Sequence, residues 1–520
     1  KDKYRYIGKE MPGVDLVAMT TGRATYGQDV RRDGMRIAVI ARPPVYGGKV
    51  KKLDSAAAEA LPGVEKVVTL PSPELPSSFQ PLGGVAVVAR NTWVAKQARE
   101  KLVIEWEDGP NADYDSAAYR AQLEREVRKP GKAARSQGDA ERGLRGATTR
   151  VEADYYLPHL AHAAMEPLAA VAEVKDGKVE VWAPTQHPQA ARDTLSKILG
   201  VPVENVTVHV TLLGGGFGRK SKPDFIVEAA LLAREVGHPV KVVWTREDDM
   251  RHDYFHTTGV SRVEAGLDAE GRIVAWRHRS AVPSIAALFA PGIEYQQPFE
   301  TGMGVTDFPY DVANYRGEAS RAPAHTRVGW YRSVVNIVHA FTIGSFLDEL
   351  AKAAGRDPRD FLLAALGPDR TLDPKELGIV GDPWNYGDSF DKHPLDTARV
   401  RGVVEKATAE AGWGTPLPNG EGRGLAVHRS FLTYVAAVVH ARVGADGKLV
   451  IPRVDIAVDA GFVANPERAR AQFEGATVMG LGNALLGEIS FKDGQPEQAN
   501  FDRFLVMRMD SAPREIRVHL

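Results

Sequence analysis

The densest local motif of the chain is a glycine-rich stretch, Leu212-Leu213-Gly214-Gly215-Gly216-Phe217-Gly218-Arg219-Lys220. It follows a predicted strand over residues 206–212 and precedes a predicted helix over residues 224–235. Four glycines in five positions allow backbone N–H groups to approach an anionic ligand, because no Cβ stands in the way. A tight strand-to-helix turn whose glycines serve close packing accounts for the composition equally well. The stretch alone therefore predicts either an anion or cofactor site or a packing turn.

Two common phosphate-binding motifs are excluded at this loop. A Walker A loop requires Gly-Lys-Ser/Thr, whereas Gly218 is followed by Arg219. The dinucleotide fingerprint Gly-x-Gly-x-x-Gly, counted from Gly214, requires a glycine where Arg219 stands. One alternative of this class remains, an unrelated phosphate-binding enzyme that uses the glycine loop alone.

Composition narrows the function further. The 520 residues include 66 Lys+Arg and 67 Asp+Glu, which gives a net charge of −1 and removes the usual reason to expect nucleic acid as a partner. The chain has no Cys, which excludes disulfides, thiolate metal sites and cysteine nucleophiles within it. No apolar stretch reaches the roughly 18 residues of a membrane-spanning helix, so none is predicted.

Outside the loop, strands and helices mix without regular alternation, which predicts an α+β fold. Residues 110–146 are polar, charged and glycine-containing, as is typical of a linker between domains. The predicted elements are strands at 35–40, 66–70, 85–89 and 102–106, hairpins over 171–182, 261–276 and 435–451, and helices over 92–100, 335–354 and 466–486.

The glycine loop resembles that of the molybdopterin-binding large subunits of the xanthine dehydrogenase and aldehyde oxidase family. Further segments resemble the same family in the same order: Thr21-Gly22-Arg23-Ala24-Thr25-Tyr26, Leu160-Ala161-His162-Ala163-Ala164-Met165-Glu166-Pro167, Pro184-Thr185-Gln186, Trp244-Thr245-Arg246-Glu247-Asp248, Val458-Asp459-Ala460-Gly461 and Gln472-Phe473-Glu474-Gly475. Arg219 after the loop, and Arg332-Ser333-Val334-Val335-Asn336, resemble the isoquinoline 1-oxidoreductase beta-subunit type most closely.

The resemblance implies an a/b hammerhead domain followed by molybdopterin-binding domains. The expected divisions are a leading segment at 1–14, the hammerhead domain at 15–110, a linker at 111–146, a first molybdopterin-binding domain at 147–400 and a second, incomplete one at 401–520.

The resemblance also implies a cofactor, molybdopterin with molybdenum, in its cytosine dinucleotide form. The metal would be held by the pterin and small inorganic ligands, so no protein metal ligand is expected. The implied cofactor-binding residues are Gln186, Gly214, Gly215, Gly216, Phe217, Gly218, Arg332 and Gln472, and the implied walls of the substrate pocket are Tyr331 and Val334.

The residues themselves allow simpler interpretations of several of these positions. Gln186 fits equally a strand-end amide satisfied locally, Gln472 a half-buried helix residue, and Arg332 a member of an ion pair with a carboxylate such as Asp348. The pairs His159/His162 and His252/His256 have no obvious third ligand and no zincin pattern, which favours structural or surface roles for them.

The implied activity is that of a molybdenum hydroxylase, an oxidoreductase that hydroxylates an N-heteroaromatic compound or oxidises an aldehyde with oxygen derived from water. Xanthine-oxidising members carry a Glu just after the glycine loop, where this chain has Arg219-Lys220-Ser221, so purine is disfavoured as substrate. Electrons would pass to an iron–sulfur small subunit or a cytochrome. The branch often carries export signals, which implies a periplasmic location, with the cytoplasm as the alternative.

The catalytic residue of the family, a general-base Glu in a Gly-Val-Gly-Glu-Pro-type segment, does not occur in the 520 residues and is expected beyond Leu520. A Gly-Gln-Gly segment that precedes the hammerhead domain in relatives is also missing. We therefore expect further residues at both ends, or a second chain that supplies the missing cofactor-domain segments. The alternative function is a catalytically incomplete fragment or a cofactor-free scaffold that keeps the fold.

Overall fold

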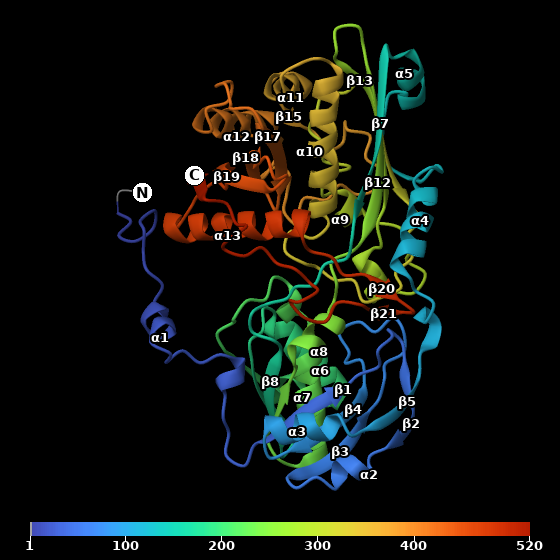
Figure 1. Ribbon diagram of the computed structural model, residues 1–520, viewed down its shortest axis with the longest axis vertical. Helices are drawn as coiled ribbons and strands as arrows, with labels where there is room; N and C mark the ends of the chain where they lie inside the picture. The colour runs from blue at the N-terminus through green and yellow to red at the C-terminus, as the bar shows by residue number, and fades with distance from the viewer. Residues whose placement is uncertain (1–2) are drawn as a thin grey trace.

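A computed structural model describes residues 3–520 and shows two lobes joined by several crossings of the chain (Figure 1). The lower lobe in that view is built on a seven-stranded sheet with the order β10-β9-β8-β11-β1-β4-β3. Its strands are β1 (Arg36–Ala41), β3 (Val64–Leu70), β4 (Gly84–Ala89), β8 (Ala169–Lys175), β9 (Lys178–Ala183), β10 (Val206–Val210) and β11 (Val240–Val243). The elements confirm the expected mixed α+β class.

The lower sheet combines two parts of the chain that were expected to be separate domains. β1 pairs in parallel with β11, Arg36 opposite Val240, so residues 15–110 share one sheet with residues 169–243. The helices of this lobe are α2 (Ala56–Glu59), α3 (Thr92–Arg99), α6 (Pro188–Leu199), α7 (Asp224–Val236) and α8 (Arg246–Arg251). A two-stranded sheet of β2 (Lys49–Asp54) and β5 (Val103–Glu107) completes it. α7 packs on β8, and its apolar side chains lie in the core of this lobe.

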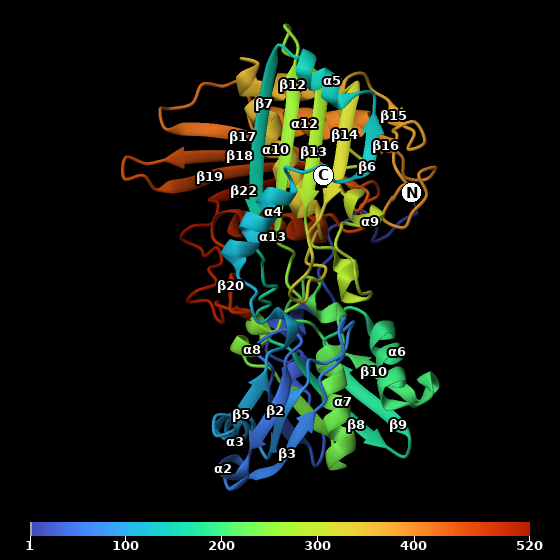
Figure 2. The ribbon, with the colours of Figure 1, turned by 90° about the vertical axis from the view of Figure 1, so that its right-hand side faces the viewer.

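The upper lobe contains a five-stranded sheet with the order β6-β14-β13-β12-β7, which faces the viewer in Figure 2. Its strands are β6 (Lys132–Gln137), β7 (Thr149–Leu157), β12 (Gly259–Leu267), β13 (Ile273–Ala281) and β14 (Asn314–Ser320). Two helices cover the sheet, α10 (Asn336–Ala353) and α11 (Pro358–Leu366). Trp276 of β13 packs against Phe346 of α10 in the core between them.

Residues 111–146, which the sequence predicts to be a linker, are folded into this lobe. They form α4 (Ser116–Glu126), β6 and α5 (Ala140–Gly146), and β6 pairs with β14. Both helices begin at an aspartate whose side chain accepts a hydrogen bond from the backbone, Asp115 from Ala118 and Asp139 from Arg142. In α4 only Tyr119 and Leu123 are buried. The other residues of this helix face solvent at least in part, which explains the polar composition of the segment.

A second sheet of the upper lobe has the order β17-β18-β19-β22. Its strands are β17 (Glu421–Ser430), β18 (Thr433–Val443), β19 (Leu449–Asp459) and β22 (Glu515–His519). Two helices lie against it, α12 (Thr397–Glu410) and α13 (Pro466–Leu485), the second beginning at the predicted cap Asn465. The expected boundary between residues 400 and 401 falls inside α12. The unit formed by this sheet and its helices therefore begins before residue 400.

The shortest elements lie in the connections. They are α1 (Leu16–Thr20), α9 (Pro298–Thr301), β15 (Thr371–Leu372), β16 (Leu395–Asp396), β20 (Phe491–Lys492), β21 (Gln495–Pro496) and the 3-10 turns at Gly27–Asp29, Gly109–Asn111, Val203–Asn205, Arg219–Ser221 and Ile285–Leu288. Residues 1 and 2 of the leading segment lie outside the described residues, and 3–14 contain neither helix nor strand. This segment runs beside the start of α13, where Asn465 donates to the carbonyl of Met11 at 3.0 Å.

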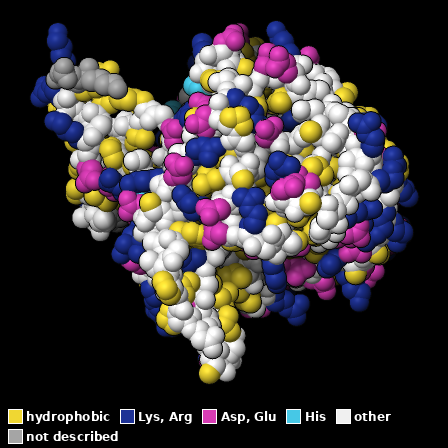
Figure 3. Space-filling view, turned by 90° about the horizontal axis from the view of Figure 1, so that it is seen from above, with side chains coloured by type: hydrophobic (Ala, Val, Ile, Leu, Met, Phe, Trp, Pro, Cys, Tyr) yellow, Lys and Arg dark blue, Asp and Glu magenta, His cyan; other side chains and the backbone are white. Residues whose placement is uncertain are grey.

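The surface carries both charge signs interspersed. Seen from the end of the upper lobe, Lys and Arg alternate with Asp and Glu, and the N-terminal segment stands away from the body (Figure 3). This pattern agrees with the net charge of −1. Among residues 3–520, no helix has the length and apolar content needed to cross a membrane.

Candidate functional site

The glycine loop connects β10 to α7 and has a backbone that few residues other than glycine could adopt. Gly215 and Gly218 have φ values of +92° and +109°, in the left-handed region that favours glycine. A Cβ on Gly216 would lie 2.5 Å from Oε1 of Gln186, and one on Gly218 would lie 2.2 Å from the carbonyl oxygen of Trp330. The loop is therefore glycine-rich because other chain segments approach its backbone closely.

The loop presents backbone donors. Among the described residues, the N–H groups of Gly215, Gly216 and Phe217 have no hydrogen-bond partner, whereas the N–H of Gly218 donates to Oε1 of Gln186 at 3.1 Å. The side-chain nitrogen of Gln186, Nε2, makes no hydrogen bond within the same part of the chain, whereas its backbone N–H donates to the carbonyl of Lys220 at 2.9 Å. Three backbone donors and one side-chain donor are thus available to a ligand with negative charge.

A largely buried carboxylate, whose side chain is 9% exposed, holds the beginning of the loop. Glu166 accepts from the backbone N–H of Gly214 at 2.9 Å and from Nζ of Lys220 at 2.6 Å. Its other oxygen accepts from the backbone N–H of Gly27, also at 2.9 Å. One side chain therefore fastens the loop to an N-terminal segment far away in the sequence. Gly214 supports the loop through these contacts and does not line the cavity, and Gly215 packs against Ala164 and the ring of Phe217.

Arg332 lies on a strained segment opposite the loop. Its guanidinium donates to the backbone carbonyl of Gln472 in α13 at 2.9 Å, and it forms no ion pair with a carboxylate among residues 3–520. Burial lowers its pKa, and Tyr331 raises it in part. The next two residues, Ser333 and Val334, have φ values of +74° and +51°. The ion-pair interpretation of Arg332 is therefore wrong, and an unpaired cation is available to an anionic ligand.

These elements meet at one open cavity of about 610 Å³ at the junction of the two lobes. It brings together eight of the ten residues that the sequence analysis assigned to the site: Gln186, Gly216, Phe217, Gly218, Tyr331, Arg332, Val334 and Gln472. Four of its lining residues other than glycine have positive φ values, namely Phe217, Ser333, Val334 and Phe431, out of ten such residues in the described chain. Strained backbone concentrated at a cavity is typical of functional sites.

Buried histidines support the wall formed by Tyr331 and Val334. His256 contacts the carbonyl oxygen of Val334 through Nε2 at 3.2 Å, and burial lowers its pKa to about 4, so it is neutral. His162 bonds Asp253 through Nδ1 at 2.9 Å. Burial raises the pKa of Tyr331 to about 12, and its hydroxyl donates to Asn483. His162 and His256 both lie in the interior of the protein. This position agrees with a structural role, which the sequence analysis favoured because neither histidine pair has an obvious third metal ligand.

Sequence reasoning missed most of the apolar wall. The additional lining residues are Ile285, Phe299, Met303, Trp330, Ser333 and Phe431. Trp330 and Ser333 adjoin Tyr331-Arg332 and could have been found from that motif. The others come from the 283–305 connection and the β17–β18 turn, which carry no motif. Among the described residues, no Asp or Glu lines the cavity, and no group of three His, Asp or Glu side chains could hold a metal ion.

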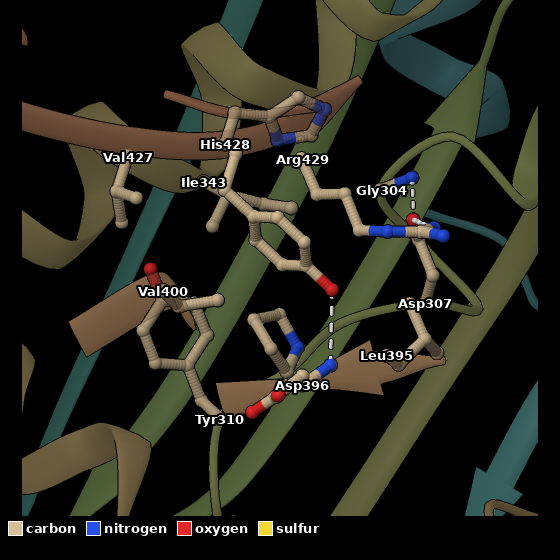
Figure 4. A pocket seen from close by; sticks show the side chains of 12 residues that line it. Gly304, Asp307, Tyr310, Ile343, Leu395, Asp396, Val400, Val427, His428 and Arg429 are labelled. Atoms are coloured by element: carbon tan, nitrogen blue, oxygen red, sulfur yellow. Dashed lines mark hydrogen bonds and ion pairs between the residues drawn. The ribbon is translucent and has the colours of Figure 1, made fainter. Parts of the chain in front are cut away.

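A second cavity lies inside the upper lobe between α10, α12 and β17 and shares no residue with the first (Figure 4). Its volume of about 30 Å³ fits one water molecule. Nε and Nη1 of Arg429 lack a hydrogen-bond partner, and Nη1 is 4.0 Å from the carboxylate of Asp307. Too small for a cofactor, this cavity fits a structural water between the two charges.

The chain was compared with known protein families, proteins and structures. Two molybdopterin cofactor-binding domain families match the chain, one over residues 124–364 and the other over residues 396–513. The beta subunit of isoquinoline 1-oxidoreductase from Brevundimonas diminuta is 31% identical over 100% of this chain and 64% of its own length. A nicotinate dehydrogenase subunit from Pseudomonas putida is 27% identical over 98% of this chain and 42% of its own length. The chain thus spans under two thirds of either relative.

Solved structures confirm the fold. Quinoline 2-oxidoreductase from Pseudomonas putida 86 superimposes with a TM-score of 0.78 at 15% identity, covering 100% of this chain and 91% of that one. Aldehyde oxidoreductase from Desulfovibrio gigas gives 0.76 at 16% identity, covering 99% and 75%. With both domain families matched in order, the chain belongs to the molybdopterin-binding proteins of the xanthine dehydrogenase and aldehyde oxidase family.

Proposed function

We propose that this chain is the cofactor-binding part of a molybdenum hydroxylase that acts on an N-heteroaromatic compound or an aldehyde. The observation that carries the proposal is the meeting of the glycine loop, Gln186, Arg332 and Gln472 at one cavity. The names of the isoquinoline and nicotinate relatives support an N-heteroaromatic substrate, and that of a membrane-bound aldehyde dehydrogenase from Gluconacetobacter polyoxogenes, 30% identical, supports an aldehyde.

The donors of the cavity fit molybdopterin. The group carries phosphate and other electronegative atoms, and the cavity offers free backbone N–H groups, the amide of Gln186 and the unpaired guanidinium of Arg332. The close approaches at Gly216 and Gly218 leave no room for a Cβ. The bound cofactor would supply the two-electron oxidation–reduction centre that the side chains lack.

The chain's own residues would bind and orient both ligands. The backbone N–H groups of Gly216 and Phe217 and the side chain of Gln186 would hold negative charge without adding a titrating group, and Arg332 would stay charged at any working pH. Phe299, Met303 and Phe431 form an apolar wall that excludes water and suits a flat, uncharged ring. No residue of the cavity in the described chain is assigned as the general base.

The deciding experiment is metal and cofactor analysis of the enzyme purified with its natural partners. We expect close to one molybdenum and one pterin per chain, and release of cytidine monophosphate on acid hydrolysis if the cofactor is the cytosine dinucleotide. Release of guanosine monophosphate instead would rule out the cytosine form of the cofactor. A preparation with neither molybdenum nor pterin would overturn the proposal in favour of a cofactor-free scaffold.

We further propose that the electrons leave through a separate iron–sulfur subunit or cytochrome, because this chain has no Cys to hold a cluster. Co-purification from native membranes and soluble extract, followed by mass spectrometry and iron analysis, tests it. Fractionation of the same cells distinguishes the proposed periplasmic location from the cytoplasmic alternative.

A further inference from the structure

The stretch that follows the glycine loop contains a buried lysine with unusual partners. Lys222 is fully buried, and its amine donates to two backbone carbonyls, that of Gly218 at 2.7 Å and that of Trp330 at 2.8 Å. Its neighbours Arg219 and Lys220 are ion-paired with Asp224 and Glu166, whereas Lys222 forms no ion pair in the described part of the chain. A buried amine that bonds only carbonyls is rare, because burial of an unpaired charge costs several kcal/mol.

The contacts of Lys222 belong to a closed ring of hydrogen bonds. The indole N–H of Trp330 donates to the hydroxyl of Ser221 at 2.6 Å, and this hydroxyl donates to the carbonyl of Gly218, also at 2.6 Å. Lys222 closes the ring from Gly218 back to Trp330. We call these four residues, Gly218, Ser221, Lys222 and Trp330, the carbonyl clasp.

The clasp lies directly behind the cavity and joins its two sets of donors. Gly218 ends the loop with the free backbone N–H groups, and Trp330 precedes Tyr331 and Arg332. Both Gly218 and Trp330 line the cavity. The side chains of the clasp therefore fix the spacing between the loop and the Arg332 segment at this point. The two backbones approach so closely that a Cβ on Gly218 would lie 2.2 Å from the carbonyl oxygen of Trp330.

The surroundings of Lys222 favour a neutral amine, which has two N–H donors for two carbonyl acceptors. Burial lowers its pKa well below the usual range, and the nearby guanidinium of Arg219 lowers it further. Arg327 acts in the same direction, while Asp224 and Asp253 act against it. The two N–H donors of a neutral amine match the two carbonyls of the clasp, and the centres of the aromatic rings of Trp330 and Tyr254 lie 4.6 and 5.9 Å from Nζ.

From these contacts we propose that Lys222 is a positioning residue that locks the glycine loop to the Arg332 segment and thereby sets the geometry in which both hold the cofactor. The inference rests on the proposed function. It assigns Lys222 no contact with cofactor or substrate, because its amine is fully used by the two carbonyls.

The test compares Lys222→Met with Lys241→Met in the complete enzyme with its partners. Lys241 is a matched control, because it is also buried and donates to one backbone carbonyl, that of Gln28 at 2.7 Å, away from the cavity. Both variants lose a buried amine and its hydrogen bonds. We measure melting temperature, molybdenum retained per chain after gel filtration, and the electron paramagnetic resonance line shape of the partly reduced metal.

We expect at least tenfold less retained molybdenum in Lys222→Met and an altered resonance in what remains, with neither change in Lys241→Met. Equal retention and an unchanged resonance in both variants would overturn the inference while leaving the proposed function intact. Absence of molybdenum from the wild-type enzyme would instead remove the proposed function. If Lys222→Met does not fold, Ser221→Ala, which opens the other half of the clasp, is expected to lower retention severalfold, and unchanged retention in it overturns the inference.

Discussion

At the scale of single residues, the identity of Gly218 is set by two separate requirements. Its φ of +109° costs an alanine about 1–2 kcal/mol, and a Cβ would lie 2.2 Å from the carbonyl oxygen of Trp330. Gly177, in the β8–β9 turn, has a φ of +73° and open space around its Cβ position. Comparing substitutions at Gly218 and Gly177 therefore separates the cost of backbone strain from the cost of steric crowding.

We predict that Gly218→Ala destabilises the protein by about 3 kcal/mol or more, and Gly177→Ala by about 1 kcal/mol, in urea unfolding. The difference arises because Trp330 belongs to the cavity wall and cannot move without disturbing it. Equal losses in the two variants would show that the loop gives way around the new methyl group, and would contradict the close packing described above.

Glu300 is a buried carboxyl directly behind the apolar wall. It accepts from the hydroxyl of Ser284 at 2.6 Å and from the backbone N–H groups of Ile285 and Gln297 at 2.8 Å. Burial raises its pKa to about 7, although these three donors lower it in part. The folded protein therefore keeps a proton on Glu300 in a pH range where the unfolded chain has released it.

The sign of the pH effect follows from this raised pKa. The contribution of Glu300 to stability is fully present below its unfolded pKa, near 4.5, and is lost as the pH rises through about 7. We predict that the stability of the wild type relative to Glu300→Gln falls by about 3 kcal/mol between pH 4.5 and 8. Urea unfolding at several pH values measures this difference. The exposed Glu204→Gln should give a profile parallel to the wild type, and a parallel profile for Glu300→Gln would exclude the buried proton.

The candidate site could be predicted from sequence only where its residues lie in motifs. The glycine loop, Gln186, Arg332 and Gln472 were found in this way, and the cavity unites them. Ile285 and Phe431 could not be found, because their positions depend on a long connection and a hairpin turn whose sequences allow many apolar choices. The buried roles of Glu166 and Lys222 were also hidden, since a charged side chain in a sequence suggests solvent until its partners are known.

At the scale of elements, α13 has one buried residue in 20, and its N-terminal cap carries an extra contact. Asn465 accepts from the backbone N–H of Arg468 and donates to the carbonyl of Met11 in the N-terminal segment. Asp115 caps α4 in the same way but does not touch that segment. Both cap residues therefore accept a hydrogen bond from the first turn of their helix, but only Asn465 also contacts the N-terminal segment.

We predict that Asn465→Ala costs about 1 kcal/mol and increases protease cleavage within residues 3–24 severalfold. Asp115→Ala should cost a similar amount and leave that cleavage rate unchanged. Limited proteolysis followed by mass spectrometry of the released peptides gives both rates. Faster cleavage at 3–24 in both variants would mean that general loosening, and not the Asn465 contact, exposes the segment.

The folded segment 111–146 shows why some elements were missed in the sequence although others were predicted with nearly the right bounds. The strands and helices with clear periodicity and caps occur where expected, including α7, α10 and α13. In 111–146 the cap residues Asp115 and Asp139 were present, but exposed polar faces outweighed them in the composition. Its strand β6 is stabilised by pairing with β14, about 180 residues later, and no local signal reports such pairing.

At the scale of the whole molecule, the lower sheet makes one unit from two parts of the sequence. β11 lies between β8 and β1, so its backbone pairs with residues 36–38 on one side and with residues 169–172 on the other. An isolated segment 15–110 would leave β1 with an open edge, and the remaining chain would leave β11 with one. The linear division into hammerhead and cofactor-binding domains therefore cuts through a continuous sheet in this lobe.

We predict that the amides of β1 and β11 exchange with solvent through the same opening event. In native-state hydrogen exchange at increasing urea, residues 36–41 and 240–243 should show the same opening free energy and the same urea dependence, because neither strand can leave the sheet without exposing the other. β18 of the upper lobe serves as the reference for a separate unit. If β1 opens at lower urea together with β3 and β4 while β11 stays protected, residues 15–110 form an independent domain after all, and the shared sheet is a docking contact between two folding units.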